Sequence, residues 1–213
     1  MENMRLATLG TLLKDLKDIG YLKTPLIERA FRAVRREVFV PEEYRTVAYE
    51  NHPLPIGFGQ TISQPLVVAF MLELLEPKIG EHILEIGMGS GWQTALLAFC
   101  VGEKGSVVGV ERIPELASFA EKNLEKIVDV PHGAIRPLLG DGTLGSSGDA
   151  PFDKIIAAAS GLVIPPTWMD QLKVGGRIVA PVGNTLVVLD KVAPTKFEER
   201  KFFGFSFVPL VGS

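Results

Sequence analysis

The amino-acid sequence predicts an α/β fold with a mostly parallel central sheet, helices on both of its faces, an antiparallel strand at the C-terminal end and a helical segment at the N-terminus. Two observations favour this fold. From residue 65 onward, short runs rich in Val and Ile alternate with helical patterns, which is the order that produces a parallel sheet covered on both sides. The chain then closes with consecutive strand-like runs, which indicate an antiparallel hairpin at one edge.

Apolar periodicity and turn residues place the elements of this core. Helices are expected at residues 65–76, 91–102, 114–127 and 165–173. Strands are expected at residues 82–87, 106–111, 134–141, 152–160, 175–183, 185–192 and 202–212.

The first part of the chain has a different pattern. Apolar residues recur at three- and four-residue steps from Leu6 to Ile19, which predicts an amphipathic helix that Gly20 ends. Thr24 and Pro25 are typical of a helix start, and we expect that second helix to run to about Glu37. Residues 46–64 show little periodicity and predict a long structured loop, a kind of segment that is commonly functional.

Composition limits the function classes. The chain has 213 residues, is 46% hydrophobic and carries a formal net charge of −3, so it lacks the electrostatic footprint of a protein that binds nucleic acid or anionic membranes. Basic residues gather in ERAFRAVRRE, but acidic residues interrupt them, and we expect a solvated helix face there. The single cysteine, Cys100, allows no intrachain disulfide and no metal-ligand spacing.

Targeting signals are not visible in the sequence. The N-terminus lacks a basic segment followed by an apolar stretch, and no apolar run approaches the length of about 18 residues that a membrane span needs. We therefore expect a cytoplasmic protein with no membrane, nucleic-acid or metal partner.

A glycine-rich turn joins a predicted strand to a predicted helix in LEIGMGSGWQ. Gly87, Gly89 and Gly91 occupy every second position. Glycine permits a tight turn and lets a ligand approach the backbone closely. A tight turn without a ligand would also be compatible with this spacing alone.

Acidic residues at neighbouring strand ends favour a ligand. Glu85 precedes the first glycine, Glu111 ends the next strand, and Asp141, followed by Gly142, ends the one after. The carboxyl ends of parallel strands meet at the edge where open α/β folds bind ligands. An acid in the position of Glu111 can accept hydrogen bonds from ribose hydroxyls.

The spacing of the glycines bears on which ligand binds. Dinucleotide sites use G-x-G-x-x-G to hold a pyrophosphate, whereas this loop is G-x-G-x-G with an acid in front of it. Flanking carboxylates suit a positively charged sulfonium nucleoside better than a pyrophosphate. The sequence therefore predicts S-adenosyl-L-methionine, with S-adenosyl-L-homocysteine as its product, in preference to NAD.

From about Phe39 to Gly212 the chain resembles the protein-L-isoaspartate (D-aspartate) O-methyltransferase family. The segments that carry the resemblance are LPIGFGQTISQP, LEIGMGSGWQTA, VERIPELA, GDGTLG, APFDKII, LKVGGRIVAPVG and FVPLVG. The resemblance implies a Rossmann-like class I S-adenosylmethionine-dependent methyltransferase fold. We expect a monomer with one methyltransferase domain over 1–213, with N-terminal helices and a substrate loop in 1–64 and a cofactor-binding α/β core in 65–213.

The resemblance also implies a reaction, the methyl esterification of the free α-carboxylate of L-isoaspartyl residues in damaged proteins and peptides, which initiates repair through a succinimide. By likeness Ser63 matches the catalytic serine, and Thr61 and Ile62 line the same substrate pocket. The residues that match the cofactor-binding positions are Glu85, Gly87, Gly89, Gly91, Glu111, Asp141 and Gly142.

Ser63 has two possible roles. It lies just before Pro65, near the start of a predicted helix, where a hydroxyl and free N–H groups can hold an anion. Because a carboxylate is already ionised at neutral pH, we expect Ser63 to orient the substrate and not to attack it. A plain helix N-cap is the alternative. His52 is the one histidine near this loop in sequence, and we expect it to pack in the loop or to contact substrate. Because no G-x-S-x-G motif is present, we do not expect a serine hydrolase.

One departure from the family pattern keeps other functions open. Residues 158–161 read Ala-Ala-Ser-Gly where the family usually has Thr-Ala-Ala and a proline. The alternative that it motivates is a carboxyl O-methyltransferase acting on a small molecule or a dedicated peptide. A third hypothesis is a non-catalytic module that binds the cofactor, against which the intact Ser63 argues.

Overall fold

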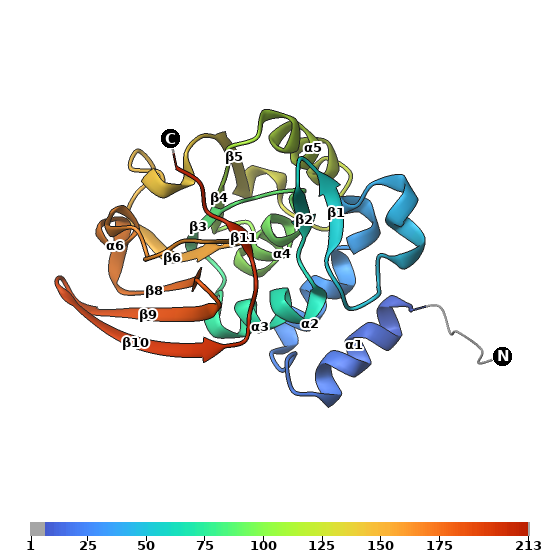
Figure 1. Ribbon diagram of the computed structural model, residues 1–213, viewed down its shortest axis with the longest axis horizontal. Coiled ribbons are helices and arrows are strands. Elements are labelled where there is room, and N and C mark those ends of the chain that lie inside the picture. The colour runs from blue at the N-terminus through green and yellow to red at the C-terminus, as the bar shows by residue number, and fades with distance from the viewer. Residues whose placement is uncertain (1–6, 213) are drawn as a thin grey trace.

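The structure, a computed structural model that describes residues 7–212, is built on a seven-stranded sheet in the order β10-β9-β8-β6-β3-β4-β5 (Figure 1). The strands are β3 (His82–Ile86), β4 (Ser106–Glu111), β5 (Ile135–Leu139), β6 (Phe152–Ala157), β8 (Leu172–Val182), β9 (Thr185–Ala193) and β10 (Lys196–Phe203). Strands β5, β4, β3, β6 and β8 are parallel, and β9 and β10 pair antiparallel. The prediction of a mostly parallel sheet with an antiparallel end is confirmed.

Helices cover both faces of the sheet, as the alternating pattern predicts. They are α3 (Pro65–Leu75), α4 (Trp92–Val101), α5 (Pro114–Leu124) and α6 (Pro166–Gln171), with short 3-10 turns η3 (His132–Ala134) and η4 (Gly142–Leu144). Successive residues of β3 pack in different hydrophobic cores. Ile83 lies in one core with residues of α3, α4 and α5, and its neighbour Leu84 lies in a second core with Trp168 of α6. Both cores are needed because parallel strands are buried on both faces.

The N-terminal layer consists of α1 (Leu9–Asp18), α2 (Pro25–Ala33), η1 (Arg36–Phe39) and η2 (Glu42–Val47), with α2 packed against α4. Gly20, at φ +78°, follows the end of α1 as predicted, and Leu6 lies outside the described residues. The second helix ends four residues earlier than expected, because Val34 adopts an extended backbone and a 3-10 turn follows.

Residues 46–64, predicted as a long structured loop, contain a hairpin of β1 (Leu54–Gly57) and β2 (Gln60–Ile62) that the sequence does not predict. Phe58 and Gly59 form its two-residue turn, and both have positive φ, as a primed hairpin turn requires. Strands of three and four residues are too short for their alternating burial to be seen as periodicity.

The end of the chain also differs from the prediction of one strand over 202–212. Strand β10 ends at Phe203, and a separate strand β11 (Val208–Pro209) pairs in parallel with β7 (Ala159–Ser160). The N–H of Leu210 donates to the carbonyl of Ser160 at 2.8 Å. The last described residues are thereby held beside the carboxyl end of β6.

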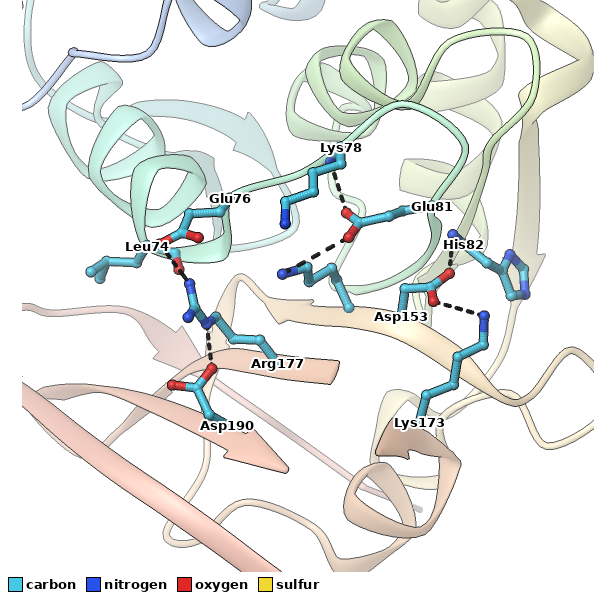
Figure 2. A network of polar contacts seen from close by, with 10 residues as sticks. Leu74, Glu76, Lys78, Glu81, His82, Asp153, Lys173, Arg177 and Asp190 are labelled. Atoms are coloured by element: carbon cyan, nitrogen blue, oxygen red, sulfur yellow. Dashed lines mark hydrogen bonds and ion pairs between the residues drawn. The ribbon is translucent and has the colours of Figure 1, made fainter. Parts of the chain in front are cut away.

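Ion pairs tie the elements together at the amino-terminal edge of the parallel strands (Figure 2). Arg177 of β8 donates to Asp190 of β9 at 2.5 Å and pairs with Glu76 at the end of α3 at 2.9 Å. Lys173 pairs with Asp153 of β6 at 2.7 Å.

Within residues 7–212 no helix is long and apolar enough to cross a membrane.

Candidate active site

A cavity of about 130 Å³ lies at the carboxyl-terminal edge of the parallel strands. Four segments supply most of its wall: the hairpin residues 60–63, the glycine loop with the end of β3 at 85–90, the end of β4 at 110–113, and the C-terminal residues 208–211. This is the edge at which the sequence predicts a ligand. The contribution of 208–211 could not be seen in the sequence, because it depends on the pairing of β11 with β7.

The glycine loop has the backbone that its composition predicts. Gly87, Gly89 and Gly91 adopt φ values of +81°, +57° and +90°, a region that side chains disfavour. Gly91 also forms the N-cap of α4, and a Cβ there would lie 3.2 Å from the side chain of Leu124. The loop therefore turns tightly from β3 into α4 and exposes backbone to the cavity.

Glu111 holds the glycine loop in place. Its Oε2 accepts a 2.9 Å hydrogen bond from the N–H of Gly89, and its Oε1 accepts from the N–H groups of Arg112 and Ile113 at 2.8 and 3.0 Å. The side chain lines the cavity although the residue is only 6% exposed. The carboxylate therefore fixes the backbone of the glycine loop at the cavity wall and can also accept hydrogen bonds from a polar ligand.

Glu85 lies deeper than the sequence suggests. It is fully buried, and its carboxyl accepts from Thr94 Oγ1 at 2.5 Å and from Gln93 Nε2 at 3.1 Å, both on the first turn of α4. Burial raises the pKa of Glu85 to about 8, against the opposing effect of these two donors. Glu85 is among the residues that line the cavity, and its direct contact with a cofactor stays a prediction.

Asp141 and Gly142 contribute to the site in different ways. Asp141 Oδ1 accepts from the N–H of Thr143 at 2.8 Å and from its hydroxyl at 2.7 Å, and so caps the η4 turn. Gly142 lines the cavity. A Cβ on Gly142 would lie 2.5 Å from Cγ2 of Ile86, so only glycine lets this turn pack against the end of β3.

A second cavity, of about 330 Å³, adjoins the first. Thr61, Ser63, Ala158 and Val208 line both cavities, and the second cavity is closed by Pro53, Gln64, Val67, Ser206 and Phe207. Ile62 borders the first cavity and is buried in the core. The predicted substrate residues 61–63 therefore form the wall between the two cavities.

Ser63 is not the N-cap of helix α3. The N-cap is Gln64, and the N–H of Leu66 donates to Oδ1 of Asn51 at 3.0 Å. Within residues 7–212 the Ser63 hydroxyl makes no hydrogen bond, while its carbonyl accepts from Arg36 Nη2 at 2.9 Å. The N-cap alternative is therefore wrong, and the hydroxyl is available to a ligand at the helix start.

His52 is one of three predicted site residues, with Gly91 and Asp141, that are not among the residues lining either cavity. Its ring nitrogens bind Glu50 at 2.7 Å and the carbonyl of Pro53 at 2.9 Å, and these two contacts raise the pKa of His52. Its side chain is not among those that line either cavity. Substrate contact by His52 remains a prediction that this geometry does not favour.

Arg36 is the polar residue near the site that the sequence analysis missed. It was expected on a solvated helix face, but it is 1% exposed. The helical pattern misplaces it because α2 ends at Ala33, so Arg36 follows a different backbone path.

Among the described residues no group of three or more His, Cys, Asp or Glu side chains is arranged to hold a metal ion.

Comparison with solved structures places this fold. A crystal structure of a putative protein-L-isoaspartate O-methyltransferase from Plasmodium falciparum, in complex with S-adenosyl-L-homocysteine, superposes with a TM-score of 0.83 at 23% identity and covers 94% of this chain and 97% of that one. A second protein-L-isoaspartate O-methyltransferase structure gives a TM-score of 0.85 at 29% identity, over 96% of this chain and 66% of that one. The fold and its site define a Rossmann-like class I methyltransferase.

The family model described as protein-L-isoaspartate(D-aspartate) O-methyltransferase matches residues 8–213. The chain belongs to this family. A protein-L-isoaspartate O-methyltransferase of Methanopyrus kandleri is 43% identical over 205 residues, which cover 94% of this chain and 90% of the relative. The protein-L-isoaspartate O-methyltransferase 1 of Archaeoglobus fulgidus is 46% identical over 187 residues, or 87% of this chain and 85% of that one.

Proposed function

We propose that the protein transfers a methyl group from S-adenosyl-L-methionine to the free α-carboxylate of L-isoaspartyl residues in damaged proteins and peptides. The ester then closes to a succinimide as the following backbone nitrogen attacks and methanol leaves, and hydrolysis returns part of the product to normal aspartate. Curated relatives that match most of this chain carry the name of this activity. The finer proposal is a cytoplasmic monomer that needs neither nucleic acid nor membrane.

The chemistry of the lining of the first cavity supports the proposed cofactor. Its polar wall offers the carboxylate of Glu111, the buried carboxyl group of Glu85 and the backbone of the glycine loop, and Arg112 is its one basic lining residue among those described. These acidic and backbone groups suit a cationic sulfonium nucleoside with ribose hydroxyls better than a pyrophosphate. When bound, S-adenosyl-L-methionine supplies an activated methyl group.

The single observation that carries the proposal is the place of Ser63 between the two cavities. Its hydroxyl has no hydrogen-bond partner among the described residues, and it precedes helix α3, whose N-terminus favours an anion. A substrate carboxylate is ionised at neutral pH and needs no general base. The protein's task is then to orient one carboxylate oxygen and to exclude water, which a hydroxyl at this wall can do.

The test uses labelled S-adenosyl-L-methionine and a matched pair of peptides that differ only in an isoaspartyl or aspartyl linkage. We expect label in the isoaspartyl peptide alone, released as methanol when the ester decomposes. Equal labelling of both peptides would contradict the proposal. Cofactor binding without any transfer would indicate a non-catalytic module.

A second candidate function rests on the stretch 158–161. Ala158 lines both cavities, so the departure from the family pattern falls where substrate meets cofactor. A small molecule or a dedicated peptide would then be the carboxyl substrate. Methylation of a purified metabolite or peptide in clear preference to isoaspartyl peptides would support this candidate.

A further inference from the structure

Arg36 joins three separated parts of the chain at the back of the substrate wall. Its Nη1 donates to the carbonyl of Ala48 at 2.6 Å, and its Nη2 donates to the carbonyls of His52 and Ser63 at 3.1 and 2.9 Å. These acceptors belong to the end of η2, to the following loop and to the residue before the N-cap of α3. One guanidinium therefore fixes the backbone that presents the Ser63 hydroxyl.

The charge of Arg36 has no counter-charge among the described residues. The neighbouring acids are paired with other residues, since Glu37 pairs with Arg35 and Glu50 pairs with His52. Within residues 7–212, Nε of Arg36 has no hydrogen-bond partner. Burial lowers the pKa of Arg36 to about 9, so it stays positive at neutral pH. Burying an unpaired charge costs folding free energy. If residue 36 served only to donate hydrogen bonds to carbonyl groups, a neutral donor would do so without this cost.

Arg36 also contacts the cofactor side. Its guanidinium carbon lies 5.2 Å from the ring centroid of Trp92, the first residue of α4 and part of the lining of the first cavity. The indole N–H of Trp92 donates to the carbonyl of Val34 at 3.4 Å. Arg36 is thus held between helix α4 and the backbone that flanks the β1-β2 hairpin.

We propose that Arg36 is a positioning residue for the substrate carboxylate, which holds Ser63 at the wall between the two cavities and supplies the positive charge that favours an anion in front of it. Arg36 itself lines neither cavity, and from behind the wall its charge finds in the carboxylate of the bound substrate the counter-charge that the described residues do not supply. This inference rests on the proposed function and adds an electrostatic source of selectivity to it.

The test measures two ligands that differ in charge. An isoaspartyl peptide and its α-carboxamide analogue are titrated into the protein saturated with S-adenosyl-L-homocysteine, for wild type, Arg36→Gln, Arg36→Lys and Lys191→Met. In Arg36→Gln we expect affinity for the carboxylate to fall by about tenfold or more, the scale of a lost charged interaction, with affinity for the carboxamide within about twofold. Arg36→Lys should keep the preference for the carboxylate.

Lys191 is the matched control, because it too is a buried basic residue that donates to backbone carbonyls, in its case those of Met169 and Leu172, and lies over an aromatic ring, that of Phe197. Its replacement should leave the ratio of the two affinities unchanged. Equal loss of both ligands in Arg36→Gln, or no loss, would overturn the inference. If Arg36→Gln does not fold, loss of the carboxylate preference in Arg36→Lys would overturn it instead.

The outcome for the inference is separable from that for the proposed function. Wild-type protein that binds the isoaspartyl peptide no better than the aspartyl one refutes the function. Wild-type preference for the isoaspartyl peptide, combined with an unchanged charge preference in Arg36→Gln, refutes only the role of Arg36.

Discussion

Asn51 Oδ1 accepts a 3.0 Å hydrogen bond from the N–H of Leu66 and so caps the start of helix α3 from a loop fifteen residues earlier in the chain. The cap is supplied at a distance, and the hydroxyl of Ser63 is spared. Capping of the helix and binding of the substrate are therefore tasks of two different residues.

This division predicts opposite results for two substitutions. Ser63→Ala should lower methyl transfer strongly and leave the free energy of unfolding within about 0.5 kcal/mol of wild type, because no protein hydrogen bond is lost. Asn51→Ala should cost about 1 kcal/mol of stability, the usual value of a lost cap. Urea unfolding and steady-state kinetics on both variants check this, and strong destabilisation by Ser63→Ala would contradict it.

Glu111→Ala should weaken the binding of S-adenosyl-L-homocysteine by about 1–3 kcal/mol, the scale of a lost charge-assisted hydrogen bond. Part of this loss should come from the glycine loop, since the N–H of Gly89 loses its acceptor. Calorimetric titration measures the change, with the exposed Glu115→Ala as control. Equal affinity in both variants would mean that the ribose lies elsewhere.

Glu85 should make the protein less stable as the pH rises. Its pKa is raised to about 8 in the folded protein from an ordinary value of 4.5, so the folded state keeps a proton that the unfolded chain releases. The contribution of Glu85 to the free energy of unfolding is fully present below the pKa of the unfolded chain and is lost as the pH rises through the pKa of the folded protein. The slope is at most about 1.4 kcal/mol per pH unit.

Glu85→Gln removes this titration and keeps a polar group beside Thr94 and Gln93. The stability of wild type should therefore fall relative to Glu85→Gln between about pH 5 and pH 8. Denaturant unfolding at several pH values gives the two curves. Curves that stay parallel across this range would show that Glu85 does not hold the proton.

Gly142→Ala should cost about 1–3 kcal/mol of stability, because the new methyl group would overlap Ile86 and force a shift in a packed region. Cofactor affinity should fall with it, since Gly142 lines the first cavity. Gly148→Ala is the control, because a Cβ there meets no atom within 4 Å. Thermal unfolding and calorimetric titration separate the two effects, and equal behaviour of the variants would contradict the packing argument.

The sequence predicts the parts of this molecule that depend on neighbours along the chain. Strand β4 and the start of helix α3 lie where periodicity and proline place them, and the three glycines adopt the backbone that their spacing indicates. The parts that depend on distant contacts could not be predicted. The burial of Arg36 is decided by carbonyls up to 27 residues away, and the wall formed by 208–211 is decided by pairing with β7.

The ion pairs shown in Figure 2 lie at the opposite edge of the sheet from the glycine loop. Arg177 links α3, β8 and β9 there, so its partners help fix the frame without touching either cavity. Adaptation to heat or salt can therefore proceed by exchanging charged residues at that edge while the chemistry is kept. For protein engineering, this edge is the place to search for thermostable variants that retain the native turnover.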